Sequence, residues 1–261
     1  MIISILGSGW LGLPLANHFI EAGHTVKAST TSQNRLHELR QAGIHPFLIN
    51  IDSLTNNIGD FLQADILIVN IPSKNVAGFR HLVSELATSN IQNILFVSST
   101  SVYQNVRRIM TEADTDFYSS SPLLDIEELF QRWSNDRTTI VRFGGLIGYS
   151  RQPGRFFKSG RIVQNPDAPV NLIHRDDCIG MISQLIEQGV WGEVFNCCAT
   201  THPTKREFYT RAAALIGTAP PQFGESNSEV GKQISNKKIT QRLNYQFQHP
   251  NLMEIEFRES P

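Results

Sequence analysis

Short apolar runs alternate with amphipathic segments along the first half of the chain. Strand-like apolar runs lie at residues 2–6, 25–28, 47–50, 66–70, 94–97 and 139–142. Between them, apolar side chains recur at helical spacing, most clearly at residues 76–89 and 123–133. Nearly unbroken Ile, Val and Leu runs suit a parallel sheet that is covered on both faces. The alternation predicts an α/β fold, a Rossmann-type doubly wound parallel sheet.

The pattern changes after Phe143. Glycine and proline become frequent between residues 144 and 160, which indicates a long loop region. Farther on we expect strands near 170–173 and 194–196, helices at 176–188 and 205–215, and a tail rich in Pro and Gln. We therefore predict a Rossmann core over residues 1–145 and small, substrate-facing C-terminal segments over residues 146–261, packed on the same core.

The first apolar run leads into the glycine-rich sequence GSGWLG, followed by a helix and a second strand. A strand, glycine turn, helix and strand within about thirty residues is the context that a dinucleotide-binding fingerprint requires. In that fingerprint Gly7 permits the turn, Gly9 admits a pyrophosphate and Gly12 lets the helix approach the sheet. The phosphates would lie at the helix N-terminus, beside Trp10 and Leu11. A turn kept only for helix packing is the alternative.

The end of the second strand bears on the choice of nicotinamide cofactor. NAD-binding units of this type usually carry Asp or Glu there, whereas this chain has Ser29, Thr30 and Thr31, with Arg35 beyond. Hydroxyls and a guanidinium can bind a 2′-phosphate that a carboxylate would repel. The sequence favours NADP, with NAD as the alternative. Ser32 is a candidate N-cap for the next helix.

Three residues that end the fourth strand are further cofactor candidates: Asn70, Ile71 and Pro72. In open α/β sheets, ligands bind beside the carboxyl ends of the strands. Simple termination of the strand explains these residues equally well.

Composition narrows the class of protein. The chain has 261 residues, a net charge of −1 and 40% hydrophobic residues. Near-neutral charge argues against nucleic-acid or membrane-surface binding, and no apolar run approaches the roughly 18 residues that span a bilayer. The N-terminal apolar run serves the first strand, so we expect no signal peptide. Cys178, Cys197 and Cys198 lack metal-ligand spacing, which predicts buried thiols in a reducing cytoplasm.

Several motifs resemble the extended short-chain dehydrogenase/reductases, the NAD-dependent epimerase/dehydratase-like proteins. They are the sequence SSTSVY after the fifth strand, Arg142 with Gly148, and the sequence VNLIHRDD. The opening GSGWLGLPL, the SSTSVY sequence and a later PGRFF resemble one bacterial branch, the YeeZ-like proteins. The resemblance covers nearly the whole chain and implies the fold and the cofactor site. It places Ser98, Phe143 and Gly144 among the cofactor contacts.

The catalytic pair of that superfamily is incomplete. There, a Tyr-x-x-x-Lys pair exchanges a proton while the nicotinamide exchanges a hydride, because the Lys lowers the pKa of the Tyr. Tyr118 is near the expected place, but Pro122 stands four residues on and no lysine lies between Lys74 and Lys158. A phenol with an unassisted pKa of about 10 is a poor base at neutral pH.

Two hypotheses follow. In the first, the protein is an NADP-dependent oxidoreductase or epimerase-like enzyme acting on a small molecule. Ser99 then holds a carbonyl oxygen, and Tyr118, Tyr103 or His174 handles the proton. In the second, it binds the cofactor without chemistry, as a sensor or partner-binding protein. Retention of Ser99 favours the first hypothesis, and loss of the Tyr and Lys favours the second.

Substrate contacts are predicted mainly from the resemblance. Dehydratases of the superfamily carry Asp-Glu where this chain has Thr100 and Ser101, so Thr100 is a candidate contact and sugar dehydration is disfavoured. Asn171 and His174 belong to the VNLIHRDD sequence. Arg155 could reach an anionic group of the substrate.

Metal binding, oligomeric state and surface charge complete the predictions. His174, Asp176 and Asp177 look like metal ligands, but a helix start explains the acids as cap and first-turn residues, so we predict no metal. The helix at 123–133 belongs to a pair that often forms dimer interfaces in that superfamily, which leaves open both a homodimer and a core role. We expect a solvated basic patch at Lys232, Lys237 and Lys238.

Overall fold

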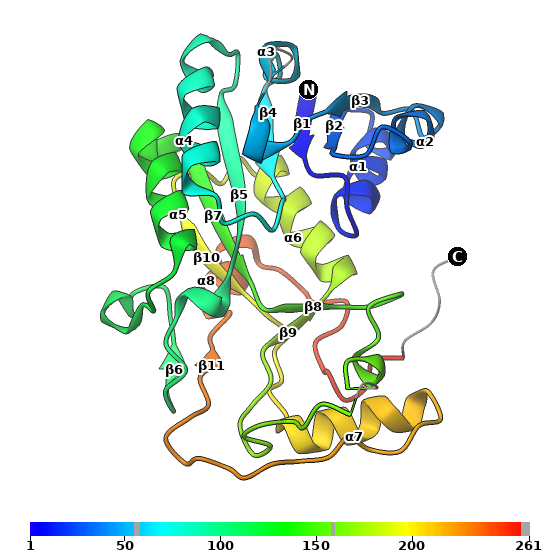
Figure 1. The fold of residues 1–261 in the computed structure, drawn as a ribbon. Helices are drawn as coiled ribbons and strands as arrows, with labels where there is room; N and C mark the ends of the chain where they lie inside the picture. Colours follow the sequence, from blue (N-terminus) through cyan, green and yellow to red (C-terminus); the bar gives the residue numbers. More distant parts are fainter. Residues whose placement is uncertain (55–57, 158–159, 257–261) are drawn as a thin grey trace. The chain divides into compact units, whose positions relative to one another are not determined.

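The computed structural model describes residues 1–54, 58–157 and 160–256 (Figure 1). Its main feature is a seven-stranded sheet with the strand order β3-β2-β1-β4-β5-β7-β10. The pairs from β3 to β5 are parallel. The order follows the doubly wound pattern, in which the chain starts in the middle and works outward twice. The predicted fold class is confirmed.

The elements of this sheet follow the predicted alternation. Its strands are β1 (Ile2–Leu6), β2 (Thr25–Thr30), β3 (His45–Leu48), β4 (Ile66–Val69), β5 (Asn93–Ser99), β7 (Thr138–Phe143) and β10 (Val194–Cys197). Its helices are α1 (Gly12–Glu21), α2 (Arg35–Gln41), α3 (Ile58–Phe61), α4 (Val76–Glu85), α5 (Pro122–Trp133) and α6 (Arg175–Glu187).

One strand lies two residues earlier than predicted. β3 ends at Leu48, whereas the apolar pattern extended it to Asn50. The Asn50 side chain accepts a hydrogen bond from the Asp52 amide and caps a 3-10 turn at Ile51–Ser53. The chain has therefore turned away from the sheet by Asn50.

The helix pair α4 and α5 covers the sheet through an aromatic cluster. Phe79 of α4, Phe96 of β5 and Phe130 of α5 have ring centroids 5.2–6.1 Å apart. Such contacts add to the burial of apolar area. The apolar face of α5 is thus part of the core, one of the two roles that the sequence left open. α1 meets the end of α6 through a 2.8 Å hydrogen bond between His18 Nε2 and Ser183 Oγ.

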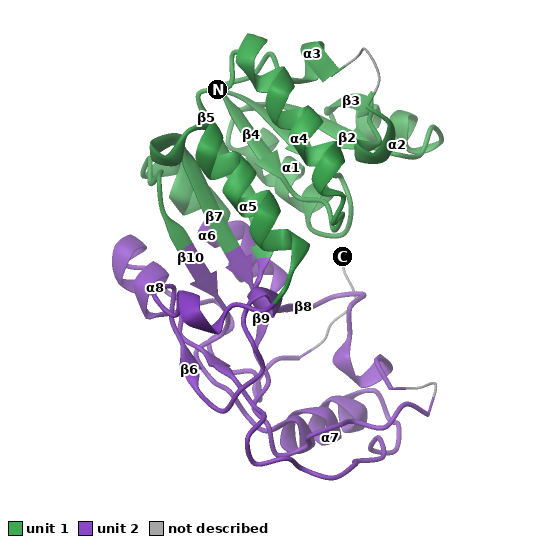
Figure 2. Ribbon diagram, turned by 60° about the vertical axis from the view of Figure 1, so that its left-hand side comes forward, with its two compact units in different colours: residues 1–98, 120–141, 182–194 green, residues 99–119, 142–181, 195–261 purple. Residues whose placement is uncertain are grey.

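The chain forms two compact units that are interleaved in sequence (Figure 2). Unit 1 contains residues 1–98, 120–141 and 182–194, and unit 2 contains residues 99–119, 142–181 and 195–261. The chain passes between units within β5, β7, α6 and β10, and between residues 119 and 120. The predicted functional division after residue 145 is contiguous in sequence, so it does not coincide with these units and stays a prediction.

Unit 2 holds structure that the sequence pattern did not reveal. The segment between β5 and α5 contains β6 (Ile109–Met110), which pairs in parallel with β11 (Gln233–Ile234) in the predicted tail. A second parallel pair joins β8 (Gly145–Ile147) to β9 (Leu172–His174). Unit 2 also contains α7 (Lys205–Leu215), which confirms the helix predicted at 205–215, and α8 (Lys237–Leu243), which was not predicted. Two-residue strands carry too little periodicity to be recognised in a sequence.

The three cysteines are free and buried, as predicted. Burial raises the pKa of the Cys178 and Cys197 thiols, which disfavours the reactive thiolate form. None of the described helices combines the length and the apolar character that crossing a membrane requires.

Candidate functional site

The turn between β1 and α1 needs two of its glycines for packing. Gly7 has a φ of +105°, and a Cβ there would lie 2.5 Å from the carbonyl oxygen of Asn70. A Cβ on Gly12 would lie 1.9 Å from the carbonyl oxygen of Gly7. Both neighbours are backbone atoms, so neither can shift without a cost in stability. Gly9 differs, since a Cβ there would meet no atom within 4 Å. Internal packing therefore explains Gly7 and Gly12 but not Gly9.

Residues of two neighbouring strands hold this turn in place. The Gly7 amide donates to Ser29 Oγ at 2.8 Å, and the Ser8 amide donates to the Ser29 carbonyl at 2.8 Å. Asn70 Nδ2 donates to the Gly7 carbonyl at 3.4 Å. Ser29 is only 2% exposed. The structure thus gives Ser29 and Asn70 the task of bracing the turn.

A cavity of about 430 Å³ opens beside the turn. It brings together most of the cofactor contacts predicted for this part of the chain: Gly7, Gly9, Ser29, Thr30, Thr31, Arg35, Asn70, Ile71 and Pro72. Three other predicted contacts do not line it: Trp10, Leu11 and Gly12. The cavity lies entirely within unit 1.

The cavity has two features that fit the phosphates of a dinucleotide. Ser8 lines it with a buried Oγ that has no hydrogen-bond partner within the described residues. A buried hydroxyl without a partner is costly unless a ligand or water satisfies it. The second feature is the N-terminus of α1, where no side chain caps the helix and the amides favour an anion.

The segment after β2 is organised differently from the prediction. Thr30 Oγ1 accepts a hydrogen bond from the Ser32 amide at 3.1 Å. The residue at the N-cap of α2 is Asn34, and its side chain makes no capping bond. The prediction of Ser32 as N-cap is wrong, because the chain makes another turn before the helix begins.

Charged groups of both signs line the same cavity. Arg35 is the first residue of α2, with its Nε 3.4 Å from Glu38 Oε2 and a side chain that is 34% exposed. Asp52 also lines the cavity and accepts a hydrogen bond from Asn75 Nδ2 at 2.7 Å. Sequence reasoning missed Asp52, although its place just beyond the carboxyl end of β3 was a usable signal.

Ser98 has a buried partner of its own. Its hydroxyl donates to Glu127 Oε1 of α5 at 2.6 Å, and both residues are less than 10% exposed. Ser98 is outside the lining of the cavity beside the turn. This bond ties the end of β5 to α5.

In unit 2, Arg142 lies between two tyrosines. Its Nη1 donates to Tyr103 Oη at 2.7 Å and its Nη2 donates to Tyr118 Oη at 2.9 Å. The Tyr103 hydroxyl in turn donates to Asn196 Oδ1 at 3.0 Å. Arg142 and Tyr103 are each 2% exposed. Burial raises the pKa of Tyr103 to about 12, although the nearby guanidinium of Arg142 acts in the opposite direction. The Tyr103 hydroxyl is therefore a poor proton donor and acceptor at neutral pH.

Lys232 is not part of a solvated patch, contrary to the prediction. Its Nζ donates to the carbonyls of Thr100 and Tyr103, at 2.8 and 2.6 Å. Burial lowers the pKa of this amine to about 8. No local spacing could reveal the contact, because the partners are about 130 residues apart in sequence.

The two predicted catalytic residues lie on segments that run together. Ser99 Oγ accepts a hydrogen bond from the Ser101 amide at 3.1 Å. The chain beside Tyr118 bonds back to this segment, since the Ser119 amide donates to the Val102 carbonyl at 2.7 Å. Ser99 and Tyr118 are both half-buried. The structure therefore brings Tyr118 to the segment that begins with Ser99.

Other predicted contacts in unit 2 have packing roles. The Asn171 side chain holds the backbone of β11, because its Nδ2 donates to the Lys232 carbonyl and its Oδ1 accepts the Ile234 amide, both at 2.8 Å. A Cβ on Gly144 would lie 2.7 Å from the Asn171 carbonyl oxygen. Phe143 is 2% exposed. Arg155 is exposed, in a 3-10 turn at Pro153–Arg155.

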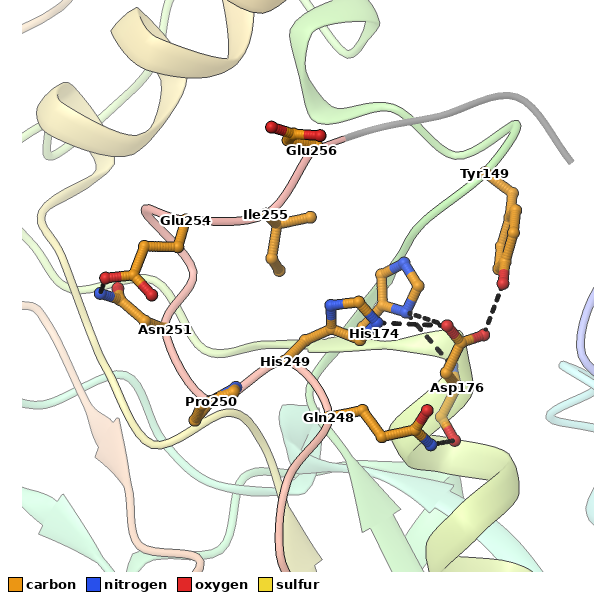
Figure 3. A pocket seen from close by; sticks show the side chains of 10 residues that line it. All are labelled: Tyr149, His174, Asp176, Gln248, His249, Pro250, Asn251, Glu254, Ile255 and Glu256. Atoms are coloured by element: carbon orange, nitrogen blue, oxygen red, sulfur yellow. Dashed lines mark hydrogen bonds and ion pairs between the residues drawn. The ribbon is translucent and has the colours of Figure 1, made fainter.

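His174 lines a separate cavity of about 460 Å³ (Figure 3). Its Nδ1 lies 3.2 Å from Asp176 Oδ2, and His249 Nε2 lies 3.2 Å from the same oxygen. Tyr149 donates to Asp176 Oδ1 at 2.8 Å. Burial alone would raise the pKa of Asp176, but the bonds from His174, His249 and Tyr149 hold it well below its usual range.

The start of α6 confirms part of the sequence-based explanation of this cluster. α6 begins at Arg175, with Asp176 and Asp177 as acids of its first turn. Sequence reasoning missed His249, which is 73 residues from Asp176 and follows no motif. It also missed Tyr149, which lies in the turn after β8 with a φ of +49° and reaches Asp176 from there.

Comparisons with known proteins bear on the cofactor site and the family. The family model for the NAD binding domain of 6-phosphogluconate dehydrogenase matches residues 2–118. A candidate NAD-dependent epimerase/dehydratase from Methylobacillus flagellatus shares the fold, with a TM-score of 0.78, 24% identity and coverage of 95% of this chain and 93% of that one. UDP-glucuronic acid 4-epimerase from Bacillus cereus, solved with UDP-glucuronic acid and NAD, has a TM-score of 0.78, 15% identity and 98% coverage of both chains.

Protein YeeZ of Escherichia coli K12 is 31% identical, over 95% of this chain and 96% of that protein. The match includes both units, since the alignment spans nearly the whole chain. The chain therefore belongs to the family of Protein YeeZ, and it has the fold of the NAD-dependent epimerase/dehydratases.

Proposed function

We propose that the protein is an NADP-binding oxidoreductase or epimerase-like enzyme that acts on a small molecule. The observation that carries cofactor binding is the cavity beside the Gly7 turn. There, Gly9 leaves open space that packing does not require, and the buried Ser8 hydroxyl has no partner among the described residues. Both features suit the close approach of a pyrophosphate to the N-terminus of α1.

The choice of NADP rests on Thr31 and Arg35. Both line the cavity, and Thr31 is exposed whereas Ser29 and Thr30 are buried. A guanidinium and a hydroxyl can hold a 2′-phosphate in charge-assisted hydrogen bonds. Asp52 adds a carboxylate to the same cavity, so NAD stays the alternative cofactor.

Two substitutions on one helix test this choice. Arg35→Ala should weaken NADPH binding by about 1–3 kcal/mol, the range for charged hydrogen bonds, and leave NADH binding nearly unchanged. Arg40→Ala, at an exposed position in the last turn of the same helix, is the matched control and should change neither. Equal losses of both cofactors in Arg35→Ala would reject the 2′-phosphate role.

For the chemistry, we assign Ser99 to the substrate oxygen and Tyr118 to the proton. A bound nicotinamide cofactor supplies hydride exchange. Arg142 Nη2 donates a hydrogen bond to Tyr118 Oη at 2.9 Å, so a cation lies beside this phenol. Arg142 would thus be the cationic neighbour of the tyrosine, in place of the lysine of Tyr-x-x-x-Lys in the superfamily. Tyr103 is excluded from this role by its burial and raised pKa.

The substrate class is drawn from the relatives of known structure. One of them was solved with UDP-glucuronic acid and NAD, so UDP-sugars form the first screening panel. With an active substrate, Ser99→Ala and Tyr118→Phe should each lower turnover by about 10²-fold or more, while NADPH affinity stays near that of the wild type. Ser101→Ala, two residues from Ser99, is the control and should keep turnover within a few-fold.

The second candidate function is a cofactor-binding sensor without chemistry. It is favoured by one observation: no Tyr-x-x-x-Lys pair occurs in the sequence. NADPH binding with no hydride exchange on any carbonyl or sugar substrate would support it.

We further propose that the protein forms a homodimer and is located in the cytoplasm. The three buried thiols suit that location. Light scattering and fractionation of cells test them.

A further inference from the structure

Three possible metal ligands converge in unit 2 on the cavity of Figure 3. His174 Nδ1, Asp176 Oδ2 and His249 Nε2 lie within 4.8 Å of one another, and each nitrogen is 3.2 Å from the oxygen. Around a tetrahedral zinc ion with bonds of about 2.0–2.1 Å, neighbouring ligand atoms lie about 3.3 Å apart. Two of the three separations therefore already match a coordination site.

The three side chains are held by other residues. Tyr149 donates to the second carboxylate oxygen of Asp176, which orients the first oxygen toward the histidines. The His174 side chain is only 6% exposed. The His249 amide donates to Asp177 Oδ2 at 3.0 Å, which fixes the backbone of that ligand. Partners of this kind orient metal ligands in proteins.

The surroundings favour a cation with open coordination positions. The cavity next to the cluster holds about 460 Å³, and its described lining contains the carboxylates of Asp176, Glu254 and Glu256 but no lysine or arginine. The N-terminus of α6 favours anions and therefore opposes a bound cation, but this effect is confined to the first turn. The free energy of three coordinate bonds would outweigh it. Coordination would replace the 3.3 Å contact between the Asp176 amide and His174 Nδ1.

We propose that His174, Asp176 and His249 bind one divalent transition metal ion of the zinc class, with a remaining position open to the cavity. Imidazole and carboxylate are the ligands that such ions take in sites with an open position. The proposal revises the sequence-based expectation of no metal, which considered neither His249 nor the cavity. It is independent of NADP binding, since every residue of the cluster lies in unit 2.

The test uses the full chain without an affinity tag, after treatment with a chelator. Titration with Co²⁺, followed by its visible absorption, should show one site per chain. Competition between Zn²⁺ and a chromophoric chelator then gives the affinity, which we expect to be micromolar or tighter. Zn²⁺ should also raise the melting temperature of the wild-type protein.

His249→Gln is the key variant. Glutamine keeps an N–H donor that reaches toward Asp176 but removes the imidazole, and the His249 side chain is 29% exposed, so the fold should tolerate the change. We expect at least tenfold weaker Zn²⁺ binding and no shift of the melting temperature by Zn²⁺. Asp176→Asn should lose binding in the same way. His37→Gln, at an exposed position on α2, is the control for adventitious histidine binding.

Two outcomes would overturn the proposal. One is a wild-type protein that binds neither Co²⁺ nor Zn²⁺ at micromolar concentrations. The other is binding that persists unchanged in His249→Gln and in Asp176→Asn, each shown to be folded by circular dichroism. In either case the cluster is a hydrogen-bonded network that positions the start of α6.

Discussion

The polar groups of the turn after Gly7 are arranged differently from those of the cluster formed by Arg142, Tyr103 and Tyr118. At the turn, the groups offered to a ligand are backbone amides and one hydroxyl, and the glycines create the space. Around Arg142, the polar side chains bind one another, as in the bonds to Tyr103 and Tyr118. The first arrangement suits the cofactor that we propose for this cavity. The second is a network in which side chains of unit 2 bond to one another.

The largest expected effect comes from separating the roles of two glycines in the turn. Gly12→Ala should lower the free energy of unfolding by about 3 kcal/mol, the upper end of overpacking costs, because its Cβ would lie 1.9 Å from a backbone oxygen. Gly9→Ala should stay within about 1 kcal/mol of the wild type, since its Cβ meets no atom within 4 Å. Urea unfolding of both variants gives these values. Equal losses would mean that Gly9 also serves packing.

Arg142→Met tests whether the cluster in unit 2 depends on its cation. Removing the guanidinium leaves the buried Tyr103 hydroxyl without its donor, and the expected loss is about 2 kcal/mol in the free energy of unfolding. Tyr118→Phe should cost less, about 1 kcal/mol or below, because Tyr118 is half-buried. A stability of Arg142→Met equal to that of the wild type would contradict the network.

Lys232 gives an effect that depends on pH. Its pKa is lowered to about 8 in the folded protein, against about 10.4 in an unfolded chain. Between these values the unfolded chain binds more protons, so the contribution of Lys232 to stability rises with pH across that window and is lowest below it. We expect the free energy of unfolding of the wild type to rise relative to that of Lys232→Met from about pH 7 to pH 10, as measured by urea unfolding. A difference that does not change with pH would mean that the Lys232 amine is solvated in the folded protein.

The same contrast explains what the sequence could predict. The turn is local: a strand, three glycines and a helix lie within about thirty residues, so spacing alone indicates the fold and the cofactor cavity. Asp52 was missed although it follows the carboxyl end of β3, because only the ends of the second and fourth strands were considered. The prediction of Ser29 as a cofactor contact relied on residue type, and only the structure shows that its hydroxyl braces Gly7.

The clusters of unit 2 could not be predicted in this way. Lys232 reaches carbonyls about 130 residues away, and His249 meets a carboxylate 73 residues away. No periodicity of apolar residues links such positions, because Lys232 lies next to a two-residue strand and His249 lies in a loop. The predictions of Ser99 and Tyr118 as catalytic residues came from the family resemblance, and so did the attention to Arg142, the cation beside Tyr118.

The most direct test of the central claim is a titration of wild-type and Gly9→Ala protein with NADPH and with NADH. It is followed by nicotinamide fluorescence and by quenching of the tryptophan emission. We predict saturable, NADPH-selective binding to the wild type and at least about tenfold weaker binding to Gly9→Ala, which corresponds to about 1.4 kcal/mol, with both proteins equally stable. Binding of neither cofactor, or equal binding by both proteins, would contradict the assignment of the Gly7 turn as a dinucleotide site.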